Sequence, residues 1–162
     1  MGVIKFRYDV ALEETMEFEM VYAEPLRFDL VEKQEMSAVP GTIFVWLFTG
    51  GVLAGESYGI PLATGNWDFE GLDGLSEAER KRAIYCHSNT ILPAFQGKGL
   101  GTILKAHWLG LVAGAGFDFV YGHARPGASQ ALNAKFGAEF IGDFPDWYGT
   151  DEEYRLYRLA VR

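Results

Sequence analysis

A glycine-rich turn between an apolar strand and a long apolar helix constrains the fold of this chain more than any other feature. Residues 83–92 are typical of a strand ended by Pro93, and from Gly99 to Gly114 apolar residues recur every three or four positions, as on a helix. A turn of this kind aims unpaired backbone N–H groups and the positive end of the helix dipole at one point, where a phosphate can bind. Residues 91–102 therefore favour a pyrophosphate as ligand.

Two common phosphate-binding motifs fit this turn less well. A P-loop needs four residues between its first glycine and a Gly-Lys pair followed by Ser or Thr, and Gly97-Lys98-Gly99 does not provide that pattern. A dinucleotide-binding fingerprint needs a third glycine at the position that Thr102 occupies. The order of strands and helices along the chain is also wrong for that fold. The P-loop interpretation therefore fails, and dinucleotide binding stays a weak alternative.

The remaining patterns predict strands and helices on both sides of this turn. Gly50-Gly51 has the composition of a hairpin turn, and Ser76 followed by Glu79 has that of a capped helix start. In chain order we expect a strand at 3–10, helices at 11–22 (with Leu12, Met16 and Met20 at helical spacing) and 27–36, strands at 42–48 and 52–60, a helix at 76–82, a strand at 83–92, a helix at 99–114, a strand at 117–121, a helix at 128–136, and strands at 138–141 and 154–161. This order indicates a mixed α/β fold, and we expect a single domain, residues 1–162.

Charge and composition narrow the classes of function. The net charge of -8 and pI near 4.8 argue against a nucleic-acid partner. The charge is unevenly distributed: the segment from Arg80 to Ala138 carries seven basic residues and one acidic residue, so the rest of the chain has a net charge of -14. The single cysteine, Cys86, excludes an internal disulfide framework, and three dispersed histidines give no support to a metal site. Without a signal peptide or a long apolar run, the protein is expected to be soluble, cytoplasmic and not bound to a membrane.

A short signature within the turn resembles that of the GNAT superfamily of N-acetyltransferases. Gln96, Gly99 and Gly101 form its Gln-x-x-Gly-x-Gly pattern, with Pro93 before it and Lys135-Phe136-Gly137 after a later short helix. The resemblance implies a central, mostly antiparallel sheet that is split at its fourth and fifth strands and flanked by helices. It also implies an enzyme that transfers an acetyl group directly from acetyl-CoA, its co-substrate, to a primary amine. The residues that would bind the cofactor are Ile91, Leu92, Gln96, Gly97, Lys98, Gly99, Leu100, Gly101, Thr102, Asn133 and Phe136.

Within this resemblance, Ile91 and Leu92 would pair with the pantetheine arm, and the backbone N–H of one of them would polarise the thioester carbonyl. The tyrosine that protonates the departing thiolate in the family falls on Asn133, which can donate a hydrogen bond but no proton. Tyr148, Tyr121 or a water would then have to replace it. A catalytically weak acyl-CoA-binding module is therefore the alternative function.

The general base is expected on the strands that lead to the turn. Tyr85, His87 and Asn89 are predicted to share one face of their strand, and His87 has a suitable intrinsic pKa. Glu56 on the preceding strand is the second candidate. The competing interpretation of His87 is a hydrogen-bonded core histidine, while His107 and Cys86 are expected to pack structurally, and Arg125 or Lys135 to reach a CoA phosphate or solvent.

The acceptor is expected to approach the side opposite the cofactor, and to be a cationic small-molecule or peptide amine. The acidic residues that would attract it are Glu13, Glu17, Asp68, Glu70, Asp146, Asp151 and Glu152, and the aromatic ones that would line its pocket are Trp67, Phe69, Trp147 and Tyr148. Those acids could equally serve solubility alone. The strand at 154–161 could also pair across a homodimer.

Overall fold

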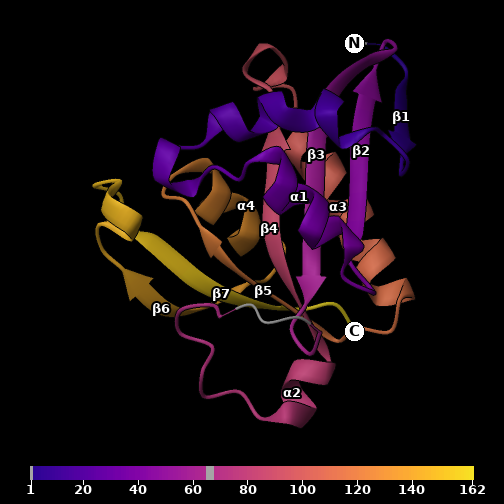
Figure 1. Ribbon diagram of the computed structural model, residues 1–162. Helices are drawn as coiled ribbons and strands as arrows, with labels where there is room; N and C mark the ends of the chain where they lie inside the picture. The colour runs from indigo at the N-terminus through magenta and orange to yellow at the C-terminus, as the bar shows by residue number, and fades with distance from the viewer. Residues whose placement is uncertain (1, 65–67) are drawn as a thin grey trace.

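A seven-stranded mixed sheet forms the centre of the computed structural model, which describes residues 2–64 and 68–162 (Figure 1). The strands are β1 (Ile4–Arg7), β2 (Ile43–Thr49), β3 (Val52–Pro61), β4 (Ala83–Ile91), β5 (Phe119–Ala124), β6 (Glu139–Phe144) and β7 (Tyr154–Ala160), in the spatial order β1-β2-β3-β4-β5-β7-β6. Of the strands in the described residues, only β4 and β5 pair in parallel. The predicted α/β fold, with a mostly antiparallel sheet, is confirmed.

Helices cover both faces of the sheet. The α-helices are α1 (Leu30–Ala38), α2 (Glu77–Lys81), α3 (Leu100–Gly114) and α4 (Ala128–Lys135), and the 3₁₀ helices are η1 (Leu12–Val21), η2 (Glu24–Leu26), η3 (Pro93–Phe95) and η4 (Trp147–Gly149). The N-terminal helices, indigo to purple in Figure 1, lie over one face, and α3 lies over the other. The sheet is therefore covered on both faces.

Local signals explain where most elements begin and end. Gly50 and Gly51 turn the β2–β3 hairpin with φ angles of 58° and 79°, which favour glycine. The Ser76 hydroxyl accepts a hydrogen bond from the Glu79 amide at the start of α2, and Asp29 forms a full capping box at α1. The apolar face of α3 packs on the sheet through Leu100, Leu104, Trp108 and Val112, all of them buried. Its residues 100–114 are close to the range predicted.

The first predicted helix differs from its expectation. Residues 12–21 form a 3₁₀ helix, and its buried residues are Thr15, Phe18 and Glu19, whereas Met20 is exposed. A 3₁₀ helix has three residues per turn, so positions 15 and 18 share a face that a spacing of four does not predict. The acidic Glu19, next to Phe18, is buried as well.

The sheet is split between β4 and β5. These strands pair over three positions only, from Ala83 with Phe119 to Tyr85 with Tyr121. Beyond them β4 continues to Ile91 beside β3, and β5 continues to Ala124 beside β7, so the two strands diverge. Cys86 and Gly122 are the first residues past the last pair, and we call this point the apex of the split.

A β-bulge lies on β4 just beyond the apex. Tyr58 and Gly59 are adjacent on β3, but their partners on β4 are Ser88 and Cys86, which leaves His87 as the extra residue. The bulge reverses the alternation of the strand. Cys86 faces α3 before the bulge, whereas Ser88 faces η1 after it and Asn89 turns to α3.

Two further expectations concern the surface. The strand at 154–161 lies inside the sheet between β5 and β6, so it cannot pair with a second copy, and the edge strand on this side of the sheet is β6. Within residues 2–64 and 68–162 no helix combines the length and apolar character needed to cross a lipid bilayer.

Candidate active site

The turn before α3 has the geometry of an anion site. Gly97 and Gly99 have φ angles of 77° and 78°, a conformation that side chains rarely adopt, and Gly99 begins α3 without a side-chain cap. The first amides of a helix have no partner within it, so the start of this 15-residue helix presents free N–H groups and a positive dipole end. The Gln96 side chain donates to the Ile91 carbonyl at 2.9 Å and ties the turn to the end of β4.

Gly101 lies beside a groove between the end of β4 and α4, and its missing side chain leaves this groove open. A Cβ atom on Gly101 would lie 3.8 Å from Cγ1 of Ile91 and 4.0 Å from Cδ2 of Leu132, between β4 and α4. Its backbone is helical and unstrained, and both distances are ordinary van der Waals contacts, so a single methyl group would be accommodated here. A larger side chain would fill the route from the turn into the split.

A cavity of about 930 Å³ runs from this turn through the split to the N-terminal helices. That volume is typical of a small-molecule site. Two buried amide oxygens in its wall, Oδ1 of Asn89 and Oδ1 of Asn133, have no hydrogen-bond partner among the described residues. Buried acceptors without partners are costly, so this wall fits a ligand that carries N–H donors.

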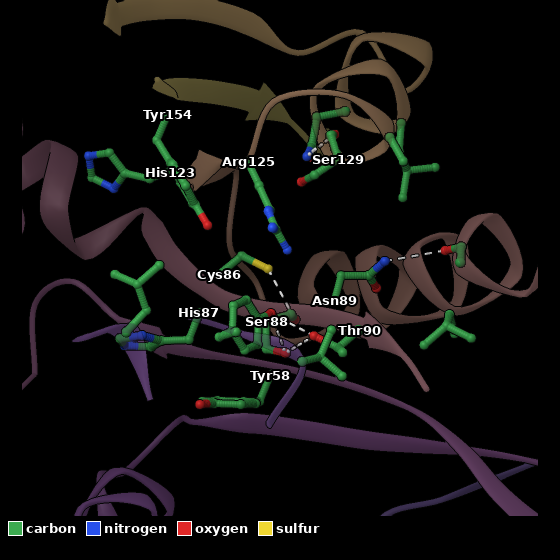
Figure 2. Close-up of a pocket in the computed structure, with 18 of the residues that line it drawn as sticks. Tyr58, Cys86, His87, Ser88, Asn89, Thr90, His123, Arg125, Ser129 and Tyr154 are labelled. Carbon is green, nitrogen blue, oxygen red and sulfur yellow. Dashed lines mark hydrogen bonds between the residues drawn. The ribbon is translucent and has the colours of Figure 1, made fainter. Parts of the chain in front are cut away.

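Aromatic rings gather around His87 on the η1 side of the apex. Phe28, Tyr58, Phe69 and Tyr85 all lie with ring centroids 5.0–5.7 Å from the His87 ring. In Figure 2, Tyr58 and His87 lie on one side of the cavity and Arg125 and Ser129 on the other. Burial lowers the pKa of His87 to about 3, so its imidazole is neutral at pH 7.

His123 and Tyr85 form a hydrogen-bonded pair beside this cluster. Nε2 of His123 lies 3.0 Å from the Glu70 carbonyl, which can only accept, so Nε2 carries the proton and Nδ1 accepts from the Tyr85 hydroxyl at 2.5 Å. Burial lowers the pKa of His123 to about 4, so this neutral form persists at pH 7. The pair fixes the side chains at the entrance of the split.

Three buried charges stand behind the aromatic cluster. Lys33 donates to both carboxylate oxygens of Glu56 at 2.9 Å and lies 3.3 Å from Oε2 of Glu19, and all three residues are at most 3% exposed. Trp46 also donates to Glu56, whose pKa is raised to about 7 by burial even though Lys33 opposes the shift. Two carboxylates share one ammonium group, and Glu19 is the member that lines the cavity.

Most of the predicted site residues meet in this cavity. It is lined by His87, Ile91, Gln96, Gly97, Gly99, Leu100, Gly101, Asn133 and Tyr148. Of the acids and aromatics expected around an acceptor, Asp68, Phe69, Glu70, Trp147 and Glu152 line it too, and Arg125 lines it in a bidentate pair with Glu152. Trp67 lies outside the described residues.

Other predicted residues lie elsewhere. Glu56 is fully buried and held by Lys33 and Trp46, which does not suit a base in contact with substrate. Leu92 packs with Phe18 and Trp46, and its amide donates to the Ala54 carbonyl of β3. Because hydrogen bonds alternate along an antiparallel pair, the amide of Ile91 points away from β3, toward the split. The predicted cofactor residues Lys98, Thr102 and Phe136, and the acids Glu13, Glu17, Asp146 and Asp151, do not line the cavity.

The bulge also corrects the prediction that Tyr85, His87 and Asn89 share one face. Tyr85 and His87 do face the η1 side, but Asn89 donates to the Gly101 carbonyl on the α3 side. His107 is structural, as expected, with its ring stacked on Phe6 at 3.7 Å. Cys86 is buried, as expected, and it lies at the cavity wall.

Sequence reasoning missed the buried Glu19 and two groups at the apex, Lys105 and Tyr157, which also line the cavity. Lys105 left a signal, because a lysine four residues after Gly101 and three before Trp108 falls on the apolar face of α3. The sequence gives no local signal for Tyr157, because the position of this residue depends on the pairing of β7 with β5.

No protein-family model matches the sequence, and no curated protein matches it either. Solved structures do. The ribosomal-protein-S18-alanine N-acetyltransferase from Escherichia coli aligns with a TM-score of 0.74 and 13% identity over 98% of this chain and 94% of that one. An aminoglycoside 6'-N-acetyltransferase complexed with coenzyme A aligns at 0.67 and 14% over 98% and 97%. A candidate acetyltransferase of the GNAT family from Desulfovibrio desulfuricans aligns at 0.68 and 18% over 99% and 100%. The chain thus has the GNAT fold.

Proposed function

We propose that this protein is an acetyl-CoA-dependent N-acetyltransferase. The observation that carries the proposal is the continuity of the cavity, which joins a glycine-rich helix start, a split in the sheet and a second chamber lined by carboxylate and aromatic groups. A phosphate site and an amine site at opposite ends of one channel suit a reaction between a long phosphorylated donor and a separate acceptor. The GNAT fold of the solved relatives supports the same assignment.

The residues of the turn and the split would hold acetyl-CoA, which supplies the activated acetyl group. The amides at the start of α3 would bind its pyrophosphate, and the positive dipole end would favour that charge. Oδ1 of Asn89 and Oδ1 of Asn133 suit the amide N–H groups of a pantetheine arm, because both oxygens are buried acceptors. The unpaired edge of β4 at Ile91 would add main-chain hydrogen bonds, as in strand addition.

Transfer forms one N–C bond and breaks one C–S bond, while the neutral amine gives up one proton and the CoA sulfur takes up one. The neutral amine forms when an ammonium releases a proton to water. His87 is poorly suited to take that proton, because burial disfavours its protonated form and so makes it a weak base, and we assign it to the wall of the acceptor chamber. Tyr148, 56% exposed, would lie at the rim of that chamber.

Glu19 favours a cationic acceptor. Its carboxylate shares Lys33 with Glu56, so the buried cluster holds two acids and one base. Near pH 7 and above, where Glu56 is ionised in part or in full, the cluster carries a net negative charge that an entering ammonium would balance, and the ammonium could also contact ring faces. We therefore propose that the acceptor is an amine that binds as its ammonium form, next to apolar or aromatic groups.

Calorimetric titration with acetyl-CoA, followed by thiol release with a panel of amines, tests the proposed reaction. We expect micromolar binding of acetyl-CoA, no binding of NADH, and thiol release that saturates with at least one amine. Binding without amine-dependent release would instead support the acyl-CoA-binding module. Absence of acetyl-CoA binding by the folded protein would contradict both functions.

The acceptor class is tested by replacing Glu19 with glutamine. In the CoA-saturated protein, 2-phenylethylamine should bind about tenfold more tightly than 2-phenylethanol, its neutral counterpart, and Glu19→Gln should reduce that ratio to below about threefold. Glu17→Gln is the matched control, because Glu17 is an exposed acid of the same helix η1 outside the cavity. Equal binding of amine and alcohol to the unmodified protein would refute the cationic acceptor.

A further inference from the structure

A lysine, a tyrosine and a cysteine converge at the apex of the split, on its α3 side. Lys105 is 1% exposed, and its ammonium donates to the Tyr157 hydroxyl at 3.2 Å and lies 3.9 Å from Sγ of Cys86. All three residues line the cavity. They lie on the opposite face of the sheet from His87 and its aromatic neighbours. The sulfur of the donor and the amine of the acceptor would therefore contact different side chains.

The environment of Lys105 is unusual for a buried base. Among the described residues, the groups that face its ammonium are the Cys86 thiol from β4, the Tyr157 phenol from β7 and the ring faces of Tyr157 and Trp108, at 5.3 and 5.6 Å, and they include no carboxylate. Burial lowers the pKa of Lys105. Perturbed groups of this kind inside a cavity are candidates for function, since structure alone gains little from them.

The backbone makes room for the Tyr157 hydroxyl. Tyr157 pairs with Gly122 of β5, and a Cβ atom on Gly122 would lie 2.6 Å from the Tyr157 hydroxyl oxygen. Glycine inside a strand weakens the strand, so its presence here fits the close approach of the phenol. Gly122 is also the first β5 residue past the last β4–β5 pair, which places the hydroxyl at the apex itself.

We propose that Tyr157 is the acid that protonates the CoA sulfur, and that Lys105 positions it and resupplies its proton. This inference depends on the proposed acetyltransferase function. As the C–S bond breaks, the sulfur takes the phenol proton, the phenol oxygen takes one from Lys105, and Lys105 is reprotonated from solvent. The relay matters because burial raises the pKa of Tyr157, so the phenol cannot remain as an anion. It would supply the proton that Asn133 cannot.

The relay predicts a measurable change in bound CoA that does not depend on the acceptor. A site built to donate a proton to sulfur also stabilises its thiolate, so the thiol of bound CoA should titrate at least about one pKa unit below that of free CoA. The thiolate is followed by its ultraviolet absorbance across pH. Desulfo-CoA, which binds without a sulfur, provides the baseline and removes the signal of Cys86.

Substitutions show which residues lower the pKa of the bound CoA thiol. Tyr157→Phe and Lys105→Met should each return most of that shift while CoA still binds, and Tyr121→Phe should retain it, because Tyr121 is a buried β5 tyrosine outside the cavity. An unshifted thiol in the unmodified protein overturns the relay and leaves acetyl-CoA binding intact, as does a shift that survives Tyr157→Phe. If the variants do not fold, the thiol pKa of CoA bound to the unmodified protein still tests the relay. Failure of CoA to bind overturns the proposed function as well.

Discussion

Gly101→Glu is expected to abolish binding of acetyl-CoA. The new side chain would enter the groove between Ile91 and Leu132, and its carboxylate would meet the pyrophosphate at the start of α3. Steric filling and like-charge repulsion together should weaken binding at least about a hundredfold, or about 3 kcal/mol. Calorimetric titration measures the loss directly.

The effect should be specific to this position on the helix. Gly110 lies on the same helix with nothing within 4 Å of its Cβ position, so Gly110→Glu adds the same charge away from the groove. Both variants replace a helical glycine, which is about 1 kcal/mol less favourable than alanine in a helix, so neither should lose thermal stability. Acetyl-CoA binding by Gly101→Glu that equals binding by Gly110→Glu would show that the ligand does not use this groove.

Lys33→Met is expected to destabilise the protein by about 3–5 kcal/mol. The substitution keeps the length of the side chain but leaves the carboxylates of Glu19 and Glu56 buried beside each other without their shared ammonium. Removing one partner of a buried ion pair costs far more than the pair contributes, because the remaining charge has lost its water and its counter-ion. Denaturant unfolding gives the change in free energy.

Two controls separate this cause from a loss of packing. Lys81→Met also breaks a Lys–Glu pair, with Glu77, but that pair is exposed on α2 and should cost no more than about 0.5 kcal/mol. Adding Glu56→Gln to Lys33→Met removes the buried carboxyl group that Lys33 holds through both oxygens, and should recover part of the loss. A double variant no more stable than Lys33→Met alone would trace the loss to packing.

The elements that sequence reasoning could predict are those whose signals are local. The glycines of the turn, the hairpin at Gly50-Gly51 and the apolar period of α3 each depend on residues a few positions apart, and each lies where it was expected. The helix at 11–22 was misjudged on a local signal too. Leu12, Thr15, Phe18 and Val21 recur at the three-residue period of a 3₁₀ helix, and that pattern was visible in the sequence.

The side chains of the candidate site could not be predicted in the same way, because their positions depend on strand register. One extra residue at His87 moves Asn89 to the opposite face from the one that simple alternation gives it. Glu56 was placed on the correct strand, but its burial depends on Lys33, which is distant in sequence. Tyr157 reaches the apex only because Gly122 stands opposite it on another strand.

The narrow junction between β4 and β5 has a mechanical consequence. Three residue pairs connect one half of the sheet, β1 to β4, with the other, β5 to β7, so few backbone hydrogen bonds resist a change of angle between the halves. A ligand that fills the split and forms hydrogen bonds with the open edge of β4 would contact both halves of the sheet and connect them. Donor binding would thereby stiffen the sheet, and because the split exists only in the folded protein, the same binding would raise the free energy of unfolding by linkage.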